Sequence, residues 1–493
     1  YILPAGTYYL GTNLTLNHRI QIQNSGGEVT LCLNGNTVMC TSNGAVIQTP
    51  TGAYSANFTL CDCQPNGSVG KITHKTGATG SGVDLQRAAN TPAHTVIMYN
   101  GCITGNTSTS GGGGVYVADS TTFTMYGGSI VDNKANPGRY ASNGGGVYVA
   151  GGDTENKYFT MYGGSITGNH TAGDGGGIYS TSNNISIYGG SVTGNSAERN
   201  GGAVYVAGTM IVGGDINISG NWKGDAQSSA SNNNANNVYL SEYGNNGSSD
   251  GPATIAIEEP LTGTGSIGIT TKTSVATTRN ASVKIAAGKG TYAITDEDKG
   301  HFTPDTGYCE VQKKNDGIYL THVHSGGTAT CTAKAKCGGC SQSYGNSNPN
   351  NHALVHHEAQ APTCTAVGWE AYDTCSRCTY TTYREIPAAH TYGAVSYTWA
   401  TDNTTCKAEH KCTACQHVEN ETVNTQKQVT QNRSCTRNEL STFTATFTNT
   451  AFVRQTEENV KTADMAPHTW KDATYTAPKT CTAVSYTHLD AAD

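Results

Sequence analysis

Charged residues are scarce in this chain, and several familiar sequence signals are missing. Asp, Glu, Lys and Arg make up 13% of the 493 residues, against about a quarter in average proteins. No Lys/Arg cluster indicates a nucleic-acid surface, and no apolar run approaches the ~18 residues of a transmembrane segment. Gly is abundant at 61 residues but follows no Gly-X-Y period, which excludes a collagen helix.

The start of the chain also lacks two signals. It begins with Tyr1 instead of Met and shows no secretory signal, so we expect that the true N-terminus is missing and that a signal peptide was lost with it. Thr, Ser, Asn, Gly and Tyr take the place of the charged residues. These residue types favour pleated strands and tight turns, so the composition indicates a mainly β protein.

An internal repeat of 24 to 36 residues runs through the first half. The segment Phe-Thr-Met-Tyr-Gly-Gly-Ser-Ile begins at Phe123 and again at Phe159, and a variant begins at Ile185. A degenerate copy begins at Val96, and a Val-Tyr-Val type segment follows each of these four copies, with its tyrosine at Tyr116, Tyr148, Tyr179 or Tyr205. The alternation of two predicts short strands. Strands this short bury a face only when successive coils stack, which predicts a parallel β-helix.

Asparagines recur at one position of this repeat. They follow Ser-Ile-Thr-Gly or its equivalent, at Asn106, Asn133, Asn169, Asn195 and Asn221. Their side chains could bind a ligand, but we favour a corner ladder hydrogen-bonded from coil to coil. The tyrosines also have two interpretations, an exposed stripe suited to sugar stacking or a place in the core or in a structural stack, and we favour the second.

Residues 1–320 resemble the pectin-lyase-like right-handed β-helix repeats of bacterial adhesin-like proteins. The resemblance rests on the repeats above, on Leu31–Val38 as an early coil, and on Ser266–Thr270 and Asp316–Leu320 as an irregular closing segment. It implies a fold more than an activity. The expected fold class is mainly β: a right-handed parallel β-helix followed by small Cys/His-rich β modules.

The family includes lyases and hydrolases of acidic polysaccharides, which need paired carboxylates or a base with cations. The regular coils lack such a constellation, so we predict no enzyme activity and no catalytic residue. Their few acidic residues sit mainly beside loops: Asp119, Asp132, Asp153, Glu155, Asp174, Glu198 and Asp215. Asp174 alone is weak grounds for a Ca²⁺ site. We expect His94 and His170 to be isolated, solvated loop residues.

The 17 cysteines are unevenly distributed, since eleven follow residue 330. This change marks a domain boundary near residues 322–331. In the first half, Cys61 and Cys63 should point to one face of a strand, which favours a cross-coil disulfide or burial over a metal site. The predicted domains are 1–243 (coils), 244–324 (closing segment), 325–395 (Cys/His repeats), 396–484 (a further repeat with strands) and 485–493 (a non-native tail resembling a translated sequencing adapter).

Cys and His in the second half have metal-ligand spacing. We predict one ligand set from Cys364, Cys375, Cys378 and His390, and a second from Cys331, Cys337, Cys340 and His352. Three Cys and one His suit tetrahedral Zn²⁺, and C-x-x-C is the usual knuckle. Disulfides are the rival staple, and we favour them slightly over Zn²⁺ because they are expected outside the cell. Either would act as a staple, because modules of this size bury little core.

The modules resemble C-terminal repeats beside β-helices in bacterial cell-surface proteins, where they look like stalks. We therefore expect a secreted or surface-displayed adhesin-like protein, with the β-helix as a rigid display body on a repeat stalk. Glycans or a host or matrix surface are the expected partners, and nucleic acid is not. The alternative is a polysaccharide lyase or hydrolase of the pectin-lyase-like superfamily, and a third interpretation is a spacer without a ligand.

Overall fold

The computed structural model is almost entirely β, and it forms a parallel β-helix followed by small antiparallel sheets. The parallel sheet turns 333° around one axis. The described residues are 1–22, 27–51, 55–63, 67–86, 93–118, 121–136, 142–150, 158–181, 183, 185–225, 234–241, 253–271, 278 and 281–468. Asp119, Asp153, Glu155 and the tail 485–493 lie outside them.

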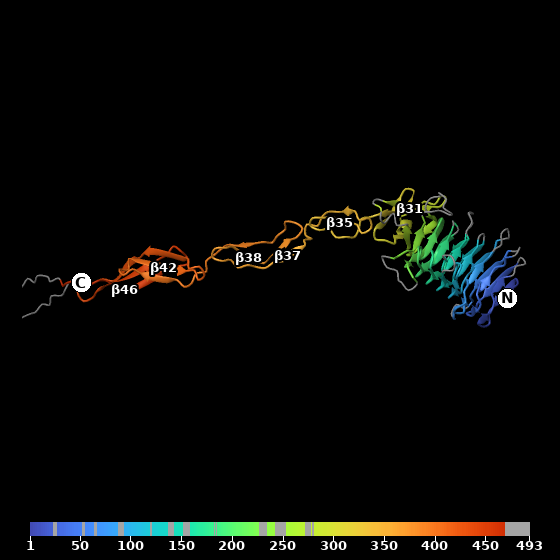
Figure 1. Cartoon of the computed structure of the whole chain (residues 1–493), viewed down its shortest axis with the longest axis horizontal. Helices are drawn as coiled ribbons and strands as arrows, with labels where there is room; N and C mark the ends of the chain where they lie inside the picture. Colours follow the sequence, from blue (N-terminus) through green and yellow to red (C-terminus); the bar gives the residue numbers. More distant parts are fainter. Residues whose placement is uncertain are drawn as a thin grey trace, which may run out of the picture. The chain divides into compact units, whose positions relative to one another are not determined.

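The coils stack along the axis, and their strands form rows. In Figure 1 the colour changes from blue to green along the stack, in sequence order. The first row holds the Val-Tyr-Val segments: β1 (Ile2–Leu3), β4 (Ile20–Ile22), β7 (Ile47–Gln48), β10 (Val83–Leu85), β14 (Val115–Val117), β18 (Val147–Val149), β22 (Ile178–Ser180), β25 (Val204–Val206), β28 (Val238–Leu240) and β30 (Ile267–Thr271). The second row holds the Phe-Thr-Met segments: β2 (Gly6–Tyr9), β5 (Glu28–Cys32), β8 (Asn57–Cys61), β11 (Thr95–Met98), β15 (Thr122–Met125), β19 (Phe159–Met161), β23 (Ile185–Thr193), β26 (Thr209–Ser219), β29 (Thr254–Leu261) and β31 (Ser282–Gly288).

Two further rows complete each coil. The third row holds the Ser-Ile-Thr segments and merges into β23, β26 and β30: β3 (Leu14–Leu16), β6 (Thr37–Cys40), β9 (Lys71–His74), β12 (Cys102–Thr104), β16 (Ser129–Val131), β20 (Ser165–Thr167) and β32 (Phe302–Pro304). The fourth is a separate sheet of short strands: β13 (Thr107–Ser108), β17 (Lys134–Ala135), β21 (His170–Thr171), β24 (Ser196–Ala197) and β27 (Trp222–Lys223).

Register between coils follows the sequence repeat, because equivalent residues pair with one another. Phe123 pairs with Phe159, and Tyr148 pairs with Tyr179. The alternate residues of each strand point inward and form one continuous apolar core of Val, Ile, Leu, Met and Phe. The predicted parallel β-helix is confirmed.

The β-helix ends in an antiparallel element. Strand β34 (Gly317–His322) pairs with β31 and with β33 (Cys309–Lys314), and a short helix, α2 (Asp296–Gly300), precedes them. Within the described residues, no helix has the length and apolar character needed to cross a membrane.

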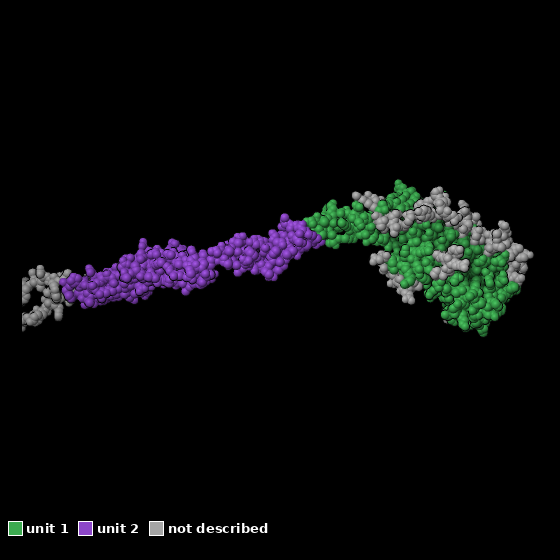
Figure 2. Space-filling model, in the orientation of Figure 1, with its two compact units in different colours: residues 1–348 green, residues 349–493 purple. Residues whose placement is uncertain are grey.

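The modules that follow are sheets of two or three antiparallel strands. Their strands are β35 (Ala335–Lys336), β36 (Ser343–Tyr344), β37 (Leu354–His357), β38 (Gly368–Trp369), β39 (Tyr372–Cys375), β40 (Glu385–Ile386), β41 (Ser396–Trp399), β42 (Thr405–Lys411), β43 (Val418–Asn424), β44 (Gln426–Gln431), β45 (Glu439–Ala445) and β46 (Gln455–Ala463). The chain divides into two compact units, residues 1–348 and 349–493, which Figure 2 colours separately. The pair β35–β36 thus belongs with the β-helix unit.

Candidate metal centres

Cys and His side chains of the modules gather in compact clusters that could hold a metal ion. Centre 1 consists of His322, His324, Cys337 and Cys340, whose ligand atoms all lie within 4.8 Å of one another. His322 ends β34, and the two cysteines occupy the turn that joins β35 to β36. Cys337 Sγ lies 3.7 Å from His322 Nε2, and Cys340 Sγ lies 3.4 Å from His324 Nδ1.

Centre 1 is largely shielded from water. His322 and Cys337 are buried, and no hydrogen-bond partner of the buried His322 Nδ1 is found among the described residues. Burial alone would raise the pKa of the Cys337 thiol. Hydrogen bonds from the Cys340 backbone and from His324 outweigh it and lower this pKa to about 5. A thiolate beside two imidazoles is a donor set that a soft dication satisfies.

Centre 2, within the second unit, brings together His352, Cys375 and Cys378. Cys378 Sγ lies 3.3 Å from His352 Nδ1, and the Tyr380 ring stacks on the imidazole with centroids 3.9 Å apart. The cause is strand pairing, because β37 and β39 set Leu354 opposite Cys375. Burial would raise the pKa of the Cys375 thiol, but the Arg377 backbone amide and His352 lower it to about 5.

Centre 3 consists of Cys364, His390, Cys412 and Cys415. The Cys364 and Cys412 sulfurs are 3.3 Å apart, and Cys415 Sγ lies 3.2 Å from His390 Nδ1. The backbone amides of Ala414 and Cys415 help to lower the pKa of Cys412 to about 5. The pKa of Cys364 rises to about 12, because its neighbours Cys412 and Cys415 disfavour another negative charge.

These separations match a tetrahedral metal site. With Zn–S near 2.3 Å and Zn–N near 2.0–2.1 Å, ligand atoms of a tetrahedral site lie about 3.3–3.8 Å apart. The Cys–His and Cys–Cys contacts of the three centres span 3.2 to 3.7 Å. The distance of 3.3 Å between the Cys364 and Cys412 sulfurs is too long for a disulfide bond. All of these contacts have about the length expected between two ligand atoms of one metal ion.

The predicted grouping of the ligands is wrong. Cys364 and His390 share a centre, but their partners are Cys412 and Cys415 and not Cys375 and Cys378. Likewise Cys337 and Cys340 lie with His322 and His324, and His352 lies with Cys375 and Cys378 instead. The physical reason is that antiparallel pairing, such as β37 with β39, returns the chain so that each C-x-x-C meets a histidine preceding it.

Cys331 occupies a turn of the same form as the one that carries Cys364. The Thr330 amide donates to Ala333 O at 2.8 Å, and the Thr363 amide donates to Ala366 O at 2.9 Å. The threonine hydroxyl accepts from the alanine amide at 3.0 Å in both turns.

Sequence reasoning missed four ligands: His322, His324, Cys412 and Cys415. The pair His322 and His324 had served only as a boundary marker. His417, two residues after Cys415, stacks on His390 with centroids 4.3 Å apart. The repeated C-x-x-C spacing was the signal that could have identified Cys412 and Cys415.

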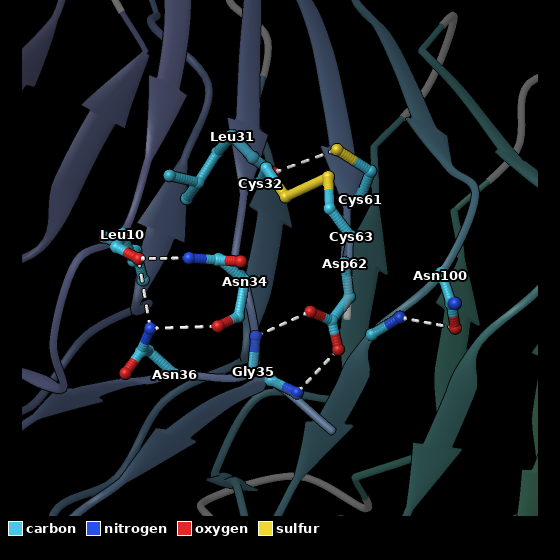
Figure 3. The surroundings of a disulfide bond; sticks show 12 residues. Leu10, Leu31, Cys32, Asn34, Gly35, Asn36, Cys61, Asp62, Cys63 and Asn100 are labelled. Atoms are coloured by element: carbon cyan, nitrogen blue, oxygen red, sulfur yellow. Dashed lines mark hydrogen bonds between the residues drawn. A yellow bond between two sulfur atoms is a disulfide. The ribbon is translucent and has the colours of Figure 1, made fainter. Parts of the chain in front are cut away.

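In the β-helix, one pair of cysteines forms a disulfide between coils. Cys32 bonds to Cys63, with Cα atoms 6.3 Å apart, and Figure 3 shows this bond above the Asp62 carboxylate. Asp62 accepts the backbone amides of Gly35 and Gly70, each at 2.7 Å. The interpretation of the Cys61–Cys63 strand as a cross-coil disulfide site is therefore confirmed for Cys63.

Two expectations about the coils need correction. His94 and His170 are buried, not solvated: His94 Nδ1 accepts the Ala56 amide at 2.8 Å, and His170 Nδ1 lies 2.9 Å from Ser196 Oγ.

The Asp174 carboxylate accepts a hydrogen bond from Asn200 at 3.1 Å. Burial raises the pKa of the Asp174 carboxyl group. The nearby acidic residue Glu198 has its carboxylate oxygen 4.0 Å from His170 Nε2.

The predicted tyrosines do form a stacked row. This inner row comprises Tyr116, Tyr148, Tyr179, Tyr205 and Tyr239, with successive ring centroids 5.2 to 5.6 Å apart. The rings are partly buried but lie outside the apolar core, because the valines on either side of each Tyr, such as Val115 and Val117, point into it. These tyrosines are therefore a structural stack and not core residues. Burial raises the pKa values of Tyr116 and Tyr148.

The chain matches no family model, and neither a curated protein nor a solved structure matches it. The fold and the clusters therefore define only a class, a parallel β-helix protein carrying Cys/His modules.

Proposed function

We propose that this protein is a display protein of the cell surface or extracellular space. In this proposal the β-helix is a rigid body that presents a binding face, and the Cys/His modules are spacers stapled by structural zinc. The observation that carries it is the set of Cys/His centres in or beside sheets of only two or three strands. Such sheets bury too little apolar area to offset chain entropy unaided, so a staple is required.

Zinc is favoured over other staples by the donor sets. Centre 1 offers two sulfurs and two imidazoles, and centre 3 offers three sulfurs and one imidazole. These are the ligand sets of structural zinc sites, whereas Ca²⁺ and Mg²⁺ prefer oxygen. A buried imidazole and thiolate without a metal would cost stability, which supports an ion at centre 1.

Location outside the cell is supported by the Cys32–Cys63 disulfide, because such bonds persist in oxidising compartments. The adhesin-like role follows from the resemblance of the coils to pectin-lyase-like surface proteins. A rigid β-helix with regular side-chain rows suits glycan or matrix partners, since its coils hold binding groups at a fixed period.

Metal content of the full chain tests the zinc staples. We expect bound zinc, with a loss of about one equivalent in Cys412→Ser, because a tetrahedral site missing one thiolate binds far more weakly. Cys435→Ser is the matched control, since Cys435 is a thiol of the same unit outside the three centres. Zinc-free protein with disulfides joining Cys364 or Cys412 would refute the proposal.

A further inference from the structure

A second tyrosine row, not singled out by the repeat analysis, runs along the coils. This outer row comprises Tyr99, Tyr126, Tyr162 and Tyr188. Successive ring centroids lie 5.2, 5.1 and 5.3 Å apart, and the rings are within 17° of parallel. The first three tyrosines each follow the last residue of a second-row strand, β11, β15 or β19, and Tyr188 lies at the equivalent place within β23.

Three tyrosines of the outer row are exposed, whereas Tyr188 and the inner row are partly buried. Tyr99, Tyr126 and Tyr162 are 53%, 47% and 48% exposed. A contiguous line of large exposed aromatic side chains on a rigid surface is uncommon without a partner. Because each ring is held by its neighbours, little side-chain entropy remains to be lost on binding.

Among the described residues, the two rows that flank the outer row from Tyr126 to Tyr188 carry no charge. Charged side chains lie beyond the ends of these rows, at Lys71 beside Cys102 and at Asp215 beside Gly189. Ser129, Ser165 and Ser191 form a paired row three residues after the tyrosines. Thr124, Thr160 and Ser186 form another row two residues before them. Because Thr160 and Ser186 are buried, the accessible hydroxyls come from the partly exposed serine row. At the end of the row, the Tyr188 hydroxyl donates to Glu258, and that carboxylate also pairs with Lys289 at 2.7 Å.

We propose that the outer row binds an extended neutral polysaccharide running along the β-helix axis, with one pyranose unit per coil. Pyranoses combine apolar C–H faces with hydroxyls, and the outer row combines aromatic rings with flanking hydroxyls. The spacing of 5.1 to 5.3 Å is comparable to the length of one sugar in an extended chain. Cations that would select a polyuronate are absent from these described rows. The inference rests on the proposed display role and assigns its ligand class.

Titration of the full chain with cellohexaose, mannohexaose and polygalacturonate tests the inference. We expect a neutral hexasaccharide to bind and polygalacturonate to bind more weakly. The double variant Tyr126→Ala/Tyr162→Ala should raise Kd about tenfold or more, because two aromatic contacts are lost. Tyr126→Phe/Tyr162→Phe should keep most of the affinity. The matched control is Tyr148→Phe/Tyr179→Phe in the inner row, which should leave Kd unchanged.

Thermal unfolding of each variant separates loss of binding from loss of fold, and the single variant Tyr162→Ala replaces the double variant if that one is unfolded. The inference is overturned if no neutral hexasaccharide binds, if Kd is unchanged in the alanine variant, or if polygalacturonate binds most tightly. Zinc content is measured on the same samples. Failed sugar binding with zinc retained removes this inference alone, whereas zinc-free wild type removes the staple proposal.

Discussion

At the scale of single residues, the asparagine ladder is a polar column beside an apolar core. From Asn106 to Asn237, each Nδ2 donates to the Oδ1 of the next asparagine at 2.9 to 3.0 Å. The amide dipoles therefore align. His74 Nδ1 lies 2.8 Å from the first oxygen, and the last Nδ2 donates to Asp305 at 2.6 Å. A donor at one end and a carboxylate at the other leave no ladder amide unsatisfied.

Asn169→Ala should destabilise the β-helix strongly. Its Oδ1 accepts the backbone and side-chain amides of Asn133, and its Nδ2 donates to Ile130 O, Thr167 O and Asn195 Oδ1. Since two buried donors lose their acceptor, we expect a loss of about 3 kcal/mol or more. Urea unfolding followed by circular dichroism measures it. The exposed Asn57→Ala is the control, and equal stability of the two variants would contradict the ladder's role.

The carboxyl group that ends the ladder should make stability depend on pH. Burial raises the pKa of Asp305, although Thr270 and Asn237 donate to it and oppose the shift. Because the folded pKa exceeds the unfolded value near 3.9, protonation favours the folded state. The stability of wild type relative to Asp305→Asn should therefore increase as pH falls from neutral through the folded pKa toward about 4.

Asp316→Asn provides a control of opposite sign. The Lys284 ammonium and the Tyr319 hydroxyl lower the pKa of the Asp316 carboxyl, so its contribution is present at neutral pH and is lost as pH falls through that lowered pKa. Parallel pH profiles for the two variants, from chemical unfolding, would show that Asp305 is not the source of the effect.

At the scale of the element, the coil was largely predictable. Short copies such as those at Phe123 and Phe159 fixed which strands pair, because a one-residue slip would turn every core side chain outward. The asparagine row was predictable for the same reason, and the stacking of Asn133, Asn169 and Asn195 is confirmed. The ends of the ladder were not, since His74 and Asp305 lie outside the repeat and reach it only through the fold.

The glycine pair at each corner should tolerate a methyl group unequally. A Cβ on Gly145 would lie 2.4 Å from His170 O and 2.6 Å from Gly176 O, both backbone atoms. At the neighbouring position, Gly146, a Cβ would lie 2.6 Å from one backbone atom, Gly177 O, in a row in which Ala203 already carries a buried methyl. We expect Gly145→Ala to cost about 1–3 kcal/mol and Gly146→Ala to cost less. Urea midpoints decide between them, and the reverse order would contradict the packing.

At the scale of the whole molecule, sequence predicted the ligand types of the modules but not their grouping. Spacing alone placed His390 with Cys378, twelve residues before it. The structure instead joins His390 to Cys412 and Cys415, because the Tyr392–Cys412 bridge brings those segments together. Such small sheets have no long periodic pattern, so their pairing cannot be deduced from periodicity. Which C-x-x-C meets which histidine depends on turns that the sequence does not specify.

The two kinds of architecture should respond differently to a chelator. The described coils between β5 and β26 are held by a continuous core and lie apart from centres 1 to 3, and in their one cysteine cluster, Cys32, Cys61 and Cys63, two sulfurs form the disulfide. In contrast, β37, β39 and β42 adjoin centres 2 and 3. Hydrogen–deuterium exchange of the full chain should therefore quicken in those three strands when EDTA is added and stay slow in the coils, because metal binding is coupled to module folding.

EDTA already saturated with zinc is the control. A reductant without chelator should leave the module strands protected, since thiolates hold zinc without disulfides. Loosening by the reductant alone would identify disulfides as the staple, and slow exchange under both treatments would mean that the modules need none.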